Sequence, residues 1–367
     1  MATQLIMTVG TNALPIWVAW YHLKDQLKQP VKVQFIYTND TEAQRDSLLN
    51  FCDNAQFGTH IKTSPGDPKT VREDIRTRIL NGLDPKTTHL HVHYTSGTKV
   101  MGVETVSAIE ERITDNANLT LETTYLDPRG DKGPRLLSRT KVYLQDARMG
   151  VKPTLDRIAN LNGFTPAPFT HEYWDPDNNG YIRDKKPAPS ELDINQETDG
   201  GNVIGDMKCG NWDVMDPVHF EYAAYVALKQ ALEAIKISNT ERSNFKIYHN
   251  VYVRRTGAQQ RDGIFELDVV AVLGYQIFVV SCTLERGHAA IKRKGMEVIL
   301  RARQVGGDEA QAIVLCKGHP ETTERVEKEL HDEIGSAGRP LRIWGTNKWR
   351  NIQNEFKQYL QNGLHWR

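Results

Sequence analysis

The first 145 residues alternate strand-like apolar runs with segments of helical spacing, and this alternation constrains the fold more than any other feature of the chain. Apolar runs lie at residues 4–10, 31–40 and 89–93, and each is followed by a polar loop and a helix-like segment. The alternation is typical of a parallel sheet whose strands are joined by crossover helices. Such a sheet binds ligands beyond the carboxyl ends of its strands. The sequence therefore predicts a doubly wound α/β domain with a ligand site at that edge.

Polar loops follow three of these strands, and their residues are candidates for contacts with a phosphate-containing ligand. The candidates are Gly10, Thr11 and Asn12, then Thr38 and Asn39, and finally Thr95, Ser96, Gly97, Thr98 and Lys99. Backbone N–H groups at the start of a helix, helped by the helix dipole, make a site for phosphate. The loops lack the spacing of a triphosphate-binding loop and the glycine fingerprint of a dinucleotide site. A polar turn without a ligand is the alternative for each loop taken alone.

Residues 148–205 change character, being rich in proline, glycine, aspartate and asparagine without a clear period. That composition is typical of a connector. We therefore expect a first domain at residues 1–147 and a second at residues 206–367. The second domain carries signals in the order helix, strand, strand, strand, helix, strand.

Asp268 lies in the middle of an otherwise apolar strand and is the centre of a candidate metal site. Strand alternation puts Glu266 on the same side as Asp268, and a hairpin at Gly274 brings Ser281 and Thr283 close to it. Hydrolysis of a phosphodiester with Mg²⁺ or Mn²⁺ requires converging oxygen ligands and a cation near the reacting atoms. Further candidate ligands are Glu221 of the leading helix, Glu285 and the main-chain carbonyl of Cys282.

This pattern resembles the PD-(D/E)xK nuclease superfamily, whose restriction-endonuclease-like core has the same order of elements. Asp268 stands where the motif has its aspartate, but Ser281 and Thr283 stand where it has glutamate and lysine. In that superfamily the lysine and glutamate can move onto the following helix. The resemblance therefore implies that Lys294 or Lys292, together with Glu297, replaces them. A solvated helix face, or contact with nucleic-acid phosphates, is the alternative for the two lysines.

The loop sequence HYTSGTKVMG, at residues 93–102, makes the first domain similar to a CARF domain, the Rossmann-like sensor of CRISPR effectors. Together the two halves resemble the ancillary nucleases of type III CRISPR systems. The resemblance implies a homodimer that is activated by a cyclic oligoadenylate, most often cyclic tetra-adenylate, and then cleaves DNA, RNA or both. It also implies that residues 10–12 and 95–99 hold the phosphates, while Thr38 and Asn39 contact adenosine.

Composition excludes some alternatives and leaves others open. Lysine plus arginine equals aspartate plus glutamate at 46 each, so any nucleic-acid-binding surface must be local. The four cysteines form no C-x-x-C pair, and neither structural zinc nor a membrane span is expected. A cytoplasmic protein is the expectation.

Two alternative functions remain. The chain could be a ligand-gated nucleic-acid-binding protein with an inactive nuclease domain, or a ring nuclease that degrades the cyclic ligand.

Overall fold

The computed structural model describes residues 2–27, 30–114, 116, 118–128, 133–166, 170–175, 180–185, 217–235, 245–258, 263–335 and 340–365. For residues 170–175, 180–185, 218 and 219 it describes the backbone alone. The chain divides into two compact units. The first contains Met1–Val151 and Asn160–Gly163, and the second contains Lys152–Ala159 and Phe164–Arg367. None of the helices in the described part of the chain is long and apolar enough to cross a membrane.

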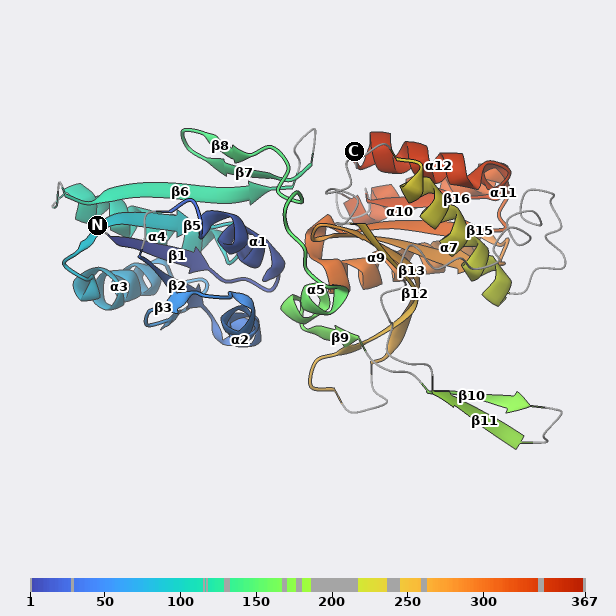
Figure 1. Ribbon diagram of the computed structural model, residues 1–367, viewed down its shortest axis with the longest axis horizontal. Helices are drawn as coiled ribbons and strands as arrows, with labels where there is room; N and C mark the ends of the chain where they lie inside the picture. Colours follow the sequence, from blue (N-terminus) through green and yellow to red (C-terminus); the bar gives the residue numbers. More distant parts are fainter. Residues whose placement is uncertain are drawn as a thin grey trace. The chain divides into compact units, whose positions relative to one another are not determined.

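The first unit is a mixed sheet with the strand order β3-β2-β1-β5-β6-β7-β8, and β4 lies beside β2 (Figure 1). Its strands are β1 (Ala2–Thr8), β2 (Val31–Tyr37), β3 (Gln56–Phe57), β4 (Ile61–Lys62), β5 (Thr87–His93), β6 (Thr120–Asp127), β7 (Arg135–Ser138) and β8 (Val142–Leu144). The pairs from β3 to β6 are parallel, as the sequence predicts, whereas the pairs of β7 with β6 and with β8 are antiparallel. The sequence did not predict β7 and β8.

Crossover helices connect the parallel strands of the first unit. They are α1 (Leu14–Leu23), α2 (Glu42–Phe51), α3 (Pro68–Arg78) and α4 (Lys99–Thr114), with 3-10 turns at Asn39–Thr41 and Leu80–Gly82. Leu90 and Val92 of β5 are fully buried with residues of α3 and α4 in one apolar core. Because strand residues alternate, the odd-numbered residues of β5 point to the opposite face of the sheet. The chain runs from β1 to β2 on one side and returns to β5 on the other, so β1 and β5 flank the topological switch point.

Residues 152–185, which follow the last strand of the first sheet in the sequence, contain several short elements. They are α5 (Leu155–Leu161), β9 (Phe164–Pro166), β10 (Thr170–Asp175) and β11 (Gly180–Lys185). Strands β10 and β11 form a two-stranded antiparallel sheet, whereas β9 pairs with β12 of the second unit. The predicted connector at 148–205 thus includes ordered elements, and its residues 186–205 lie outside the described part of the chain. The exact domain limits stay a prediction.

The second unit is a mixed sheet with the order β16-β15-β14-β13-β12-β9. Its main elements are α7 (Pro217–Glu233), β12 (Phe245–Arg255), β13 (Phe265–Leu273), β14 (Gln276–Thr283), α9 (His288–Gly306), β15 (Gln311–Cys316), α10 (Pro320–Ile334) and β16 (Leu341–Trp344). Strands β12, β13 and β14 are antiparallel, and β14, β15 and β16 are parallel. The order of these helices and strands agrees with the sequence prediction.

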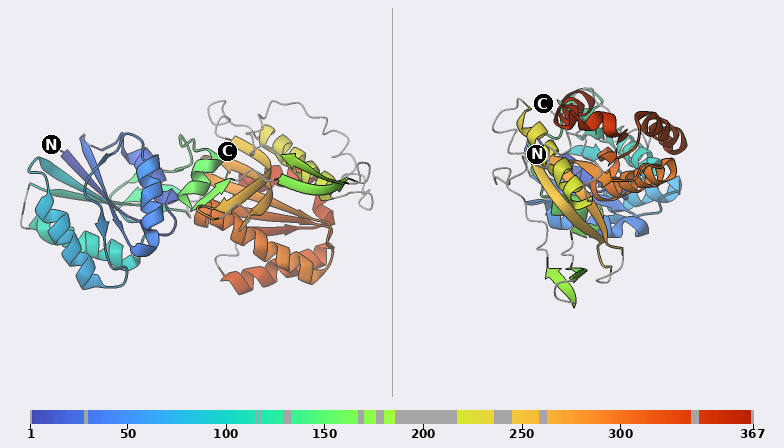
Figure 2. Two further views of the ribbon diagram at one scale, coloured as in Figure 1. Left: turned by 90° about the horizontal axis from the view of Figure 1, so that it is seen from below. Right: turned by 90° about the vertical axis from the view of Figure 1, so that its right-hand side faces the viewer.

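Helices cover both faces of this sheet (Figure 2). Ile277 of β14 packs against Gly306 of α9, while the next residue, Phe278, packs on the other face against Phe356. Phe356 belongs to a C-terminal group of short helices that the sequence did not predict. This group consists of α11 (Thr346–Trp349), α12 (Ile352–Gln358) and a π-helical turn at Tyr359–Gly363, and a 3-10 turn at Gly307–Glu309 follows α9. Helix α12 packs beside α7, and α10 packs beside α9.

Candidate functional site

The candidate site of the second unit forms where β13 and β14 separate. Their antiparallel ladder runs from Leu273 paired with Gln276 to Val269 paired with Val280. Beyond that pair, β14 continues beside β15, and β13 continues beside β12. Asp268 is the first residue of β13 past the end of the shared ladder, and its side chain is only 6% exposed. A carboxylate therefore occupies the fork between two diverging strands.

Two hydrogen bonds fix the Asp268 carboxylate at this fork. Oδ2 accepts one from Ser281 Oγ at 3.0 Å and one from the backbone N of Cys282 at 2.6 Å. The carboxylate thus bonds a backbone N–H that lies beyond the end of the β13–β14 ladder. Burial raises the pKa of Asp268, and the positive charge of Lys294 together with these hydrogen bonds opposes the rise. Both bonds fall on Oδ2, so Oδ1 is available for a cation.

Helix α9 brings a lysine to the same place. Lys294, Glu297 and Arg301 are spaced three and four residues apart and line a small pocket together with Glu266 and Ser281. Burial raises the pKa of Cys282, as it does that of Asp268, and the nearby positive charge of Lys294 opposes both rises. In the described part of the chain Lys294 has no carboxylate oxygen within 4.0 Å, so its charge is not already neutralised by an ion pair.

Lys292 lies on another side of the same helix. Its Nζ bonds Glu333 Oε1 at 2.5 Å and Glu329 Oε2 at 3.4 Å, both on α10. Two residues along a helix rotate a side chain by about 200°, which explains why the two lysines meet different partners. Of the two lysines that the sequence offered, the structure brings Lys294 to Asp268 and holds Lys292 against α10.

The remaining predicted carboxylates occupy different positions around the fork. Glu266 is exposed, lines the pocket and hydrogen-bonds Tyr252, its cross-strand partner on β12. Burial raises the pKa of Tyr252 and of Cys282, and the charge of Glu221, which lies on α7, adds a smaller rise to both. Glu285 is exposed beside Arg293, with 3.7 Å between Oε1 and Nη2. The sequence did not single out Tyr252, and only the register of the β12–β13 hairpin would have found it.

The donor set at the fork suits a hard divalent cation, because such ions prefer carboxylate and other oxygen ligands. The carboxylates of Glu266 and Glu297 line the pocket, and the charges of Glu297 and Lys294 act on the nearby Asp268. Within the described residues these carboxylates do not bring three ligand atoms within 4.8 Å of one another. Cation binding would therefore require small movements of the two glutamate side chains.

In the first unit, the loops after β1 and β5 meet at the carboxyl ends of their strands and hydrogen-bond each other. Ser96 Oγ donates to the carbonyl of Asn12 at 2.8 Å and accepts from Gly10 N at 3.0 Å, and the Thr8 hydroxyl bonds the Ser96 carbonyl. A Cβ at Gly10 would lie 2.5 Å from Ser96 Oγ and closer still to the backbone N of Gly97. Gly97 adopts a φ of 86°, a conformation that favours glycine.

Most hydroxyl groups of these loops already have partners within the unit. Thr95 Oγ1 accepts from Leu126 N at 2.6 Å, and Thr98 Oγ1 donates to Pro65 O at 2.7 Å. Thr38 Oγ1 lies 3.2 Å from Thr41 Oγ1, with which it shares a hydrogen bond. The predicted ligand residues that remain exposed are Thr11, Asn39, Gly97, Thr98 and Lys99. The loops therefore offer a ligand mainly backbone groups, the Thr11 hydroxyl, one amide side chain and one ammonium group.

Comparison with solved structures defines the class of fold to which the chain belongs. No protein-family model matches the chain, and no curated protein matches it in sequence. The chain is similar over 98% of its length, and 98% of the other, to protein VC1899 from Vibrio cholerae, at a TM-score of 0.64 and 11% identity. This likeness extends across both units and shows a shared fold.

A second likeness is to a type III CRISPR defence DNA nuclease activated by cyclic oligoadenylate. It covers 87% of this chain at a TM-score of 0.52 and 17% identity. The chain spans only 46% of that nuclease. At this identity the likeness again concerns the fold, which the two proteins share.

Proposed function

We propose that this chain is a metal-dependent endonuclease of type III CRISPR defence that a cyclic oligoadenylate activates. The first unit would be the CARF-like sensor, and the second the PD-(D/E)xK-like nuclease. The fold shared with a cyclic-oligoadenylate-activated DNA nuclease supports this assignment. The observation that carries it is the meeting of Asp268 and Lys294 at the strand fork, because Lys294 supplies the cation that the Ser-Cys-Thr sequence lacks.

The residues of the fork divide the chemistry of phosphodiester hydrolysis among them. Asp268, with Glu266 and Glu297, would hold Mg²⁺ or Mn²⁺, and such an ion polarises a phosphoryl oxygen and lowers the pKa of water. Lys294 would place an ammonium group beside the attacking water or the phosphate. Arg301, which stacks 4.3 Å over the ring of Phe265, would contribute a fixed positive charge toward a nucleic-acid phosphate.

The exposed groups of the interlocked loops fit a phosphate-rich ligand in the first unit. Lys99 supplies charge at the start of α4, where the helix dipole also favours an anion. Asn39 is the exposed amide that would contact a base or ribose. A cyclic tetra-adenylate has two-fold symmetry, so it would suit the isologous interface of a homodimer. Its preference for one arrangement of the dimer would then switch the nuclease.

Matched alanine variants of the two lysines of α9 test the nuclease assignment. The substrate is supercoiled plasmid DNA with Mg²⁺ or Mn²⁺ and cyclic tetra-adenylate, and RNA is assayed in parallel. Lys294→Ala is expected to slow cleavage by roughly 100-fold, since it removes a charge aimed at the reacting phosphate. Lys292→Ala is the control, because it disrupts only partly exposed ion pairs to α10.

Equal rates for the two lysine variants would contradict the role of Lys294. Cleavage by wild type that ignores the cyclic ligand would contradict the sensor assignment. Retention of DNA without any product would instead favour a ligand-gated binding protein. The occupied Oδ2 of Asp268 and the missing Glu-x-Lys favour that second candidate.

A further inference from the structure

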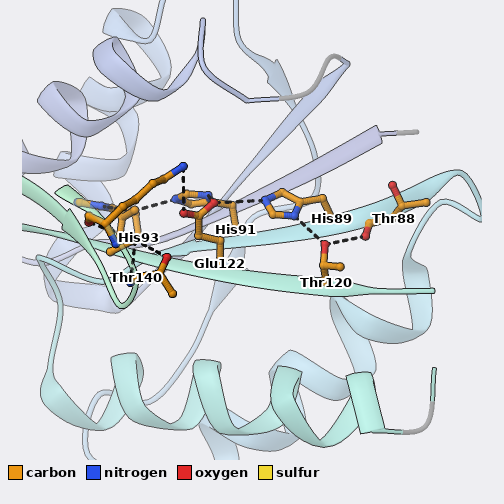
Figure 3. A network of polar contacts seen from close by, with 10 residues as sticks. Thr88, His89, His91, His93, Thr120, Glu122 and Thr140 are labelled. Carbon is orange, nitrogen blue, oxygen red and sulfur yellow. Dashed lines mark hydrogen bonds and ion pairs between the residues drawn. The ribbon is translucent and has the colours of Figure 1, made fainter. Parts of the chain in front are cut away.

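Three histidines follow one another along β5, on the face of the first unit's sheet that is opposite α3 and α4. His89, His91 and His93 alternate with the buried Leu90 and Val92 along β5. The parallel register sets His91 beside Glu122 of β6 (Figure 3). This cluster lies outside both of the sites described above.

The ring nitrogens of two histidines and one carboxylate oxygen surround a common point. Glu122 Oε2 lies 4.0 Å from His89 Nε2 and 4.0 Å from His91 Nδ1. The three ligand atoms all lie within 4.8 Å of one another. A tetrahedral zinc ion keeps its ligand atoms roughly 3.4 Å apart. A small inward rotation of the three side chains therefore completes the spacing.

Threonine hydroxyls orient the two rings from behind. His89 Nδ1 lies 2.8 Å from Thr120 Oγ1, and His91 Nε2 lies 2.9 Å from Thr124 Oγ1. Each ring thus uses one nitrogen for a threonine. Figure 3 shows that both rings also face Glu122, at the distances given above. Hydrogen bonds of this kind to the second ring nitrogen are typical of histidines that bind metals.

His91 provides an independent indication that the cluster binds a ligand. Its side chain is fully buried, and its Nδ1 makes no hydrogen bond. A buried polar atom without a partner is costly, so such atoms are uncommon in folded proteins. The unbonded nitrogen points toward the carboxylate of Glu122, where a cation would satisfy both groups.

We propose that His89, His91 and Glu122 bind a divalent transition-metal ion such as Zn²⁺, with water as the fourth ligand. Two imidazoles and one carboxylate form a donor set that suits zinc. His89 and Glu122 are 20% and 23% exposed, which gives the ion a path from solvent.

The hairpin of β7 and β8 supports the Glu122 carboxylate. Lys141 Nζ lies 3.7 Å from the other oxygen, Oε1, and sits 4.1 Å over the ring of Tyr143. Tyr143 also hydrogen-bonds Glu122. Lys141 therefore lies beside Oε1, while Oε2 remains on the histidine side. A bound ion would join β5 to β6 directly before the loop of residues 95–99.

Titration of the full-length, untagged Asp268→Asn protein with Co²⁺ tests this site. That substitution weakens the candidate cation site of the second unit, so the result does not depend on the proposed nuclease. We expect about one Co²⁺ per chain, the visible absorption of a tetrahedral Co²⁺ complex, and displacement by Zn²⁺. His89→Ala and Glu122→Gln should each weaken binding by at least 10- to 100-fold.

His60→Asn serves as the control. His60 lies in the same unit but is not part of the cluster, and its Nδ1 accepts a hydrogen bond from Phe35 N. Circular dichroism of each variant confirms that it is folded, and Glu122→Gln preserves the shape of the side chain if His89→Ala does not fold. Unchanged Co²⁺ affinity in His89→Ala and Glu122→Gln would overturn the proposal. A wild-type spectrum without tetrahedral features would overturn it too.

Discussion

The loops of the first unit and the strand fork of the second hold their polar groups in opposite ways. In the first unit, Gly10, Ser96 and Thr98 satisfy one another or neighbouring backbone atoms at close range. In the second, Asp268 is buried with a raised pKa and faces a lysine that has no ion pair in the described chain. The first arrangement depends on shape, and the second depends on charge. Adding volume should therefore break the loops, whereas removing charge should break the fork.

The largest expected effect comes from removing the charge of the fork while keeping its shape. Asp268→Asn retains an oxygen that can accept from Ser281 and Cys282, but it weakens any bond to a divalent cation. Loss of a group that only supports a metal ligand reduces activity by about 10- to 100-fold. Asp268 is proposed as a direct ligand, so we expect plasmid cleavage to fall by more than about 100-fold. Initial rates at saturating metal measure this, and cleavage near the wild-type rate would remove Asp268 from the chemistry.

Adding one methyl group to the loops tests the opposite side of the comparison. Gly10→Ala places a Cβ against Ser96 and the backbone of Gly97, so we expect the first unit to lose about 1–3 kcal/mol of stability. Gly66→Ala is the matched control, because a Cβ there meets no atom within 4 Å. Urea unfolding followed by circular dichroism compares the two. Equal stability would show that the loops can move apart at little cost.

A smaller effect is expected where the loops do use charge. Lys99→Ala should weaken binding of cyclic tetra-adenylate by about tenfold, the loss of one charge-assisted hydrogen bond. The control is Lys86→Ala, since this exposed lysine precedes β5 and lies at the other end of the strand. Isothermal titration calorimetry at two salt concentrations gives both affinities. Identical affinities for the two variants would locate the ligand elsewhere.

The smallest effect concerns stability against pH at the fork. Because burial raises the pKa of Asp268 in the folded state, the folded protein binds this proton more tightly than the unfolded chain does. Ionised Asp268 therefore destabilises the second unit at high pH, and the penalty disappears as pH falls through the raised pKa.

In the presence of a chelator at pH 8, Asp268→Asn should therefore have a higher melting temperature than wild type. The rise should be roughly 2–4 °C for each kcal/mol by which the substitution stabilises the fold. The difference should shrink at lower pH. Thermal unfolding across this range measures it, and a variant that is less stable at every pH would contradict the sign of the pKa shift.

Much of the fold follows from local patterns that are visible in the sequence. The alternation of the first 145 residues and the apolar strands around Asp268 predict the order of the main helices and strands. Spacing along α9 also predicts that Lys294 and Glu297 share a face. Each of these inferences depends on patterns among residues that are close together in the sequence.

The other features depend on contacts between distant residues. Lys292 meets Glu329 and Glu333 only because α10 packs beside α9. The HLHVH stretch identifies a strand, but its relation to Glu122 requires the register between β5 and β6. The hydroxyls of Thr95 and Thr98 look like ligand donors in sequence, and tertiary packing gives them internal partners.

The divergence of β13 and β14 has a consequence for the backbone itself. The amide of Cys282 donates to a side chain that can titrate, whereas the amides of the ladder bond fixed carbonyl groups. Protonation of Asp268, or capture of its charge by a cation, changes how strongly that amide is held. The hydrogen-exchange rate of this amide should therefore change when Asp268 is protonated or binds a cation. Measuring that rate reports the charge of Asp268 without any added label.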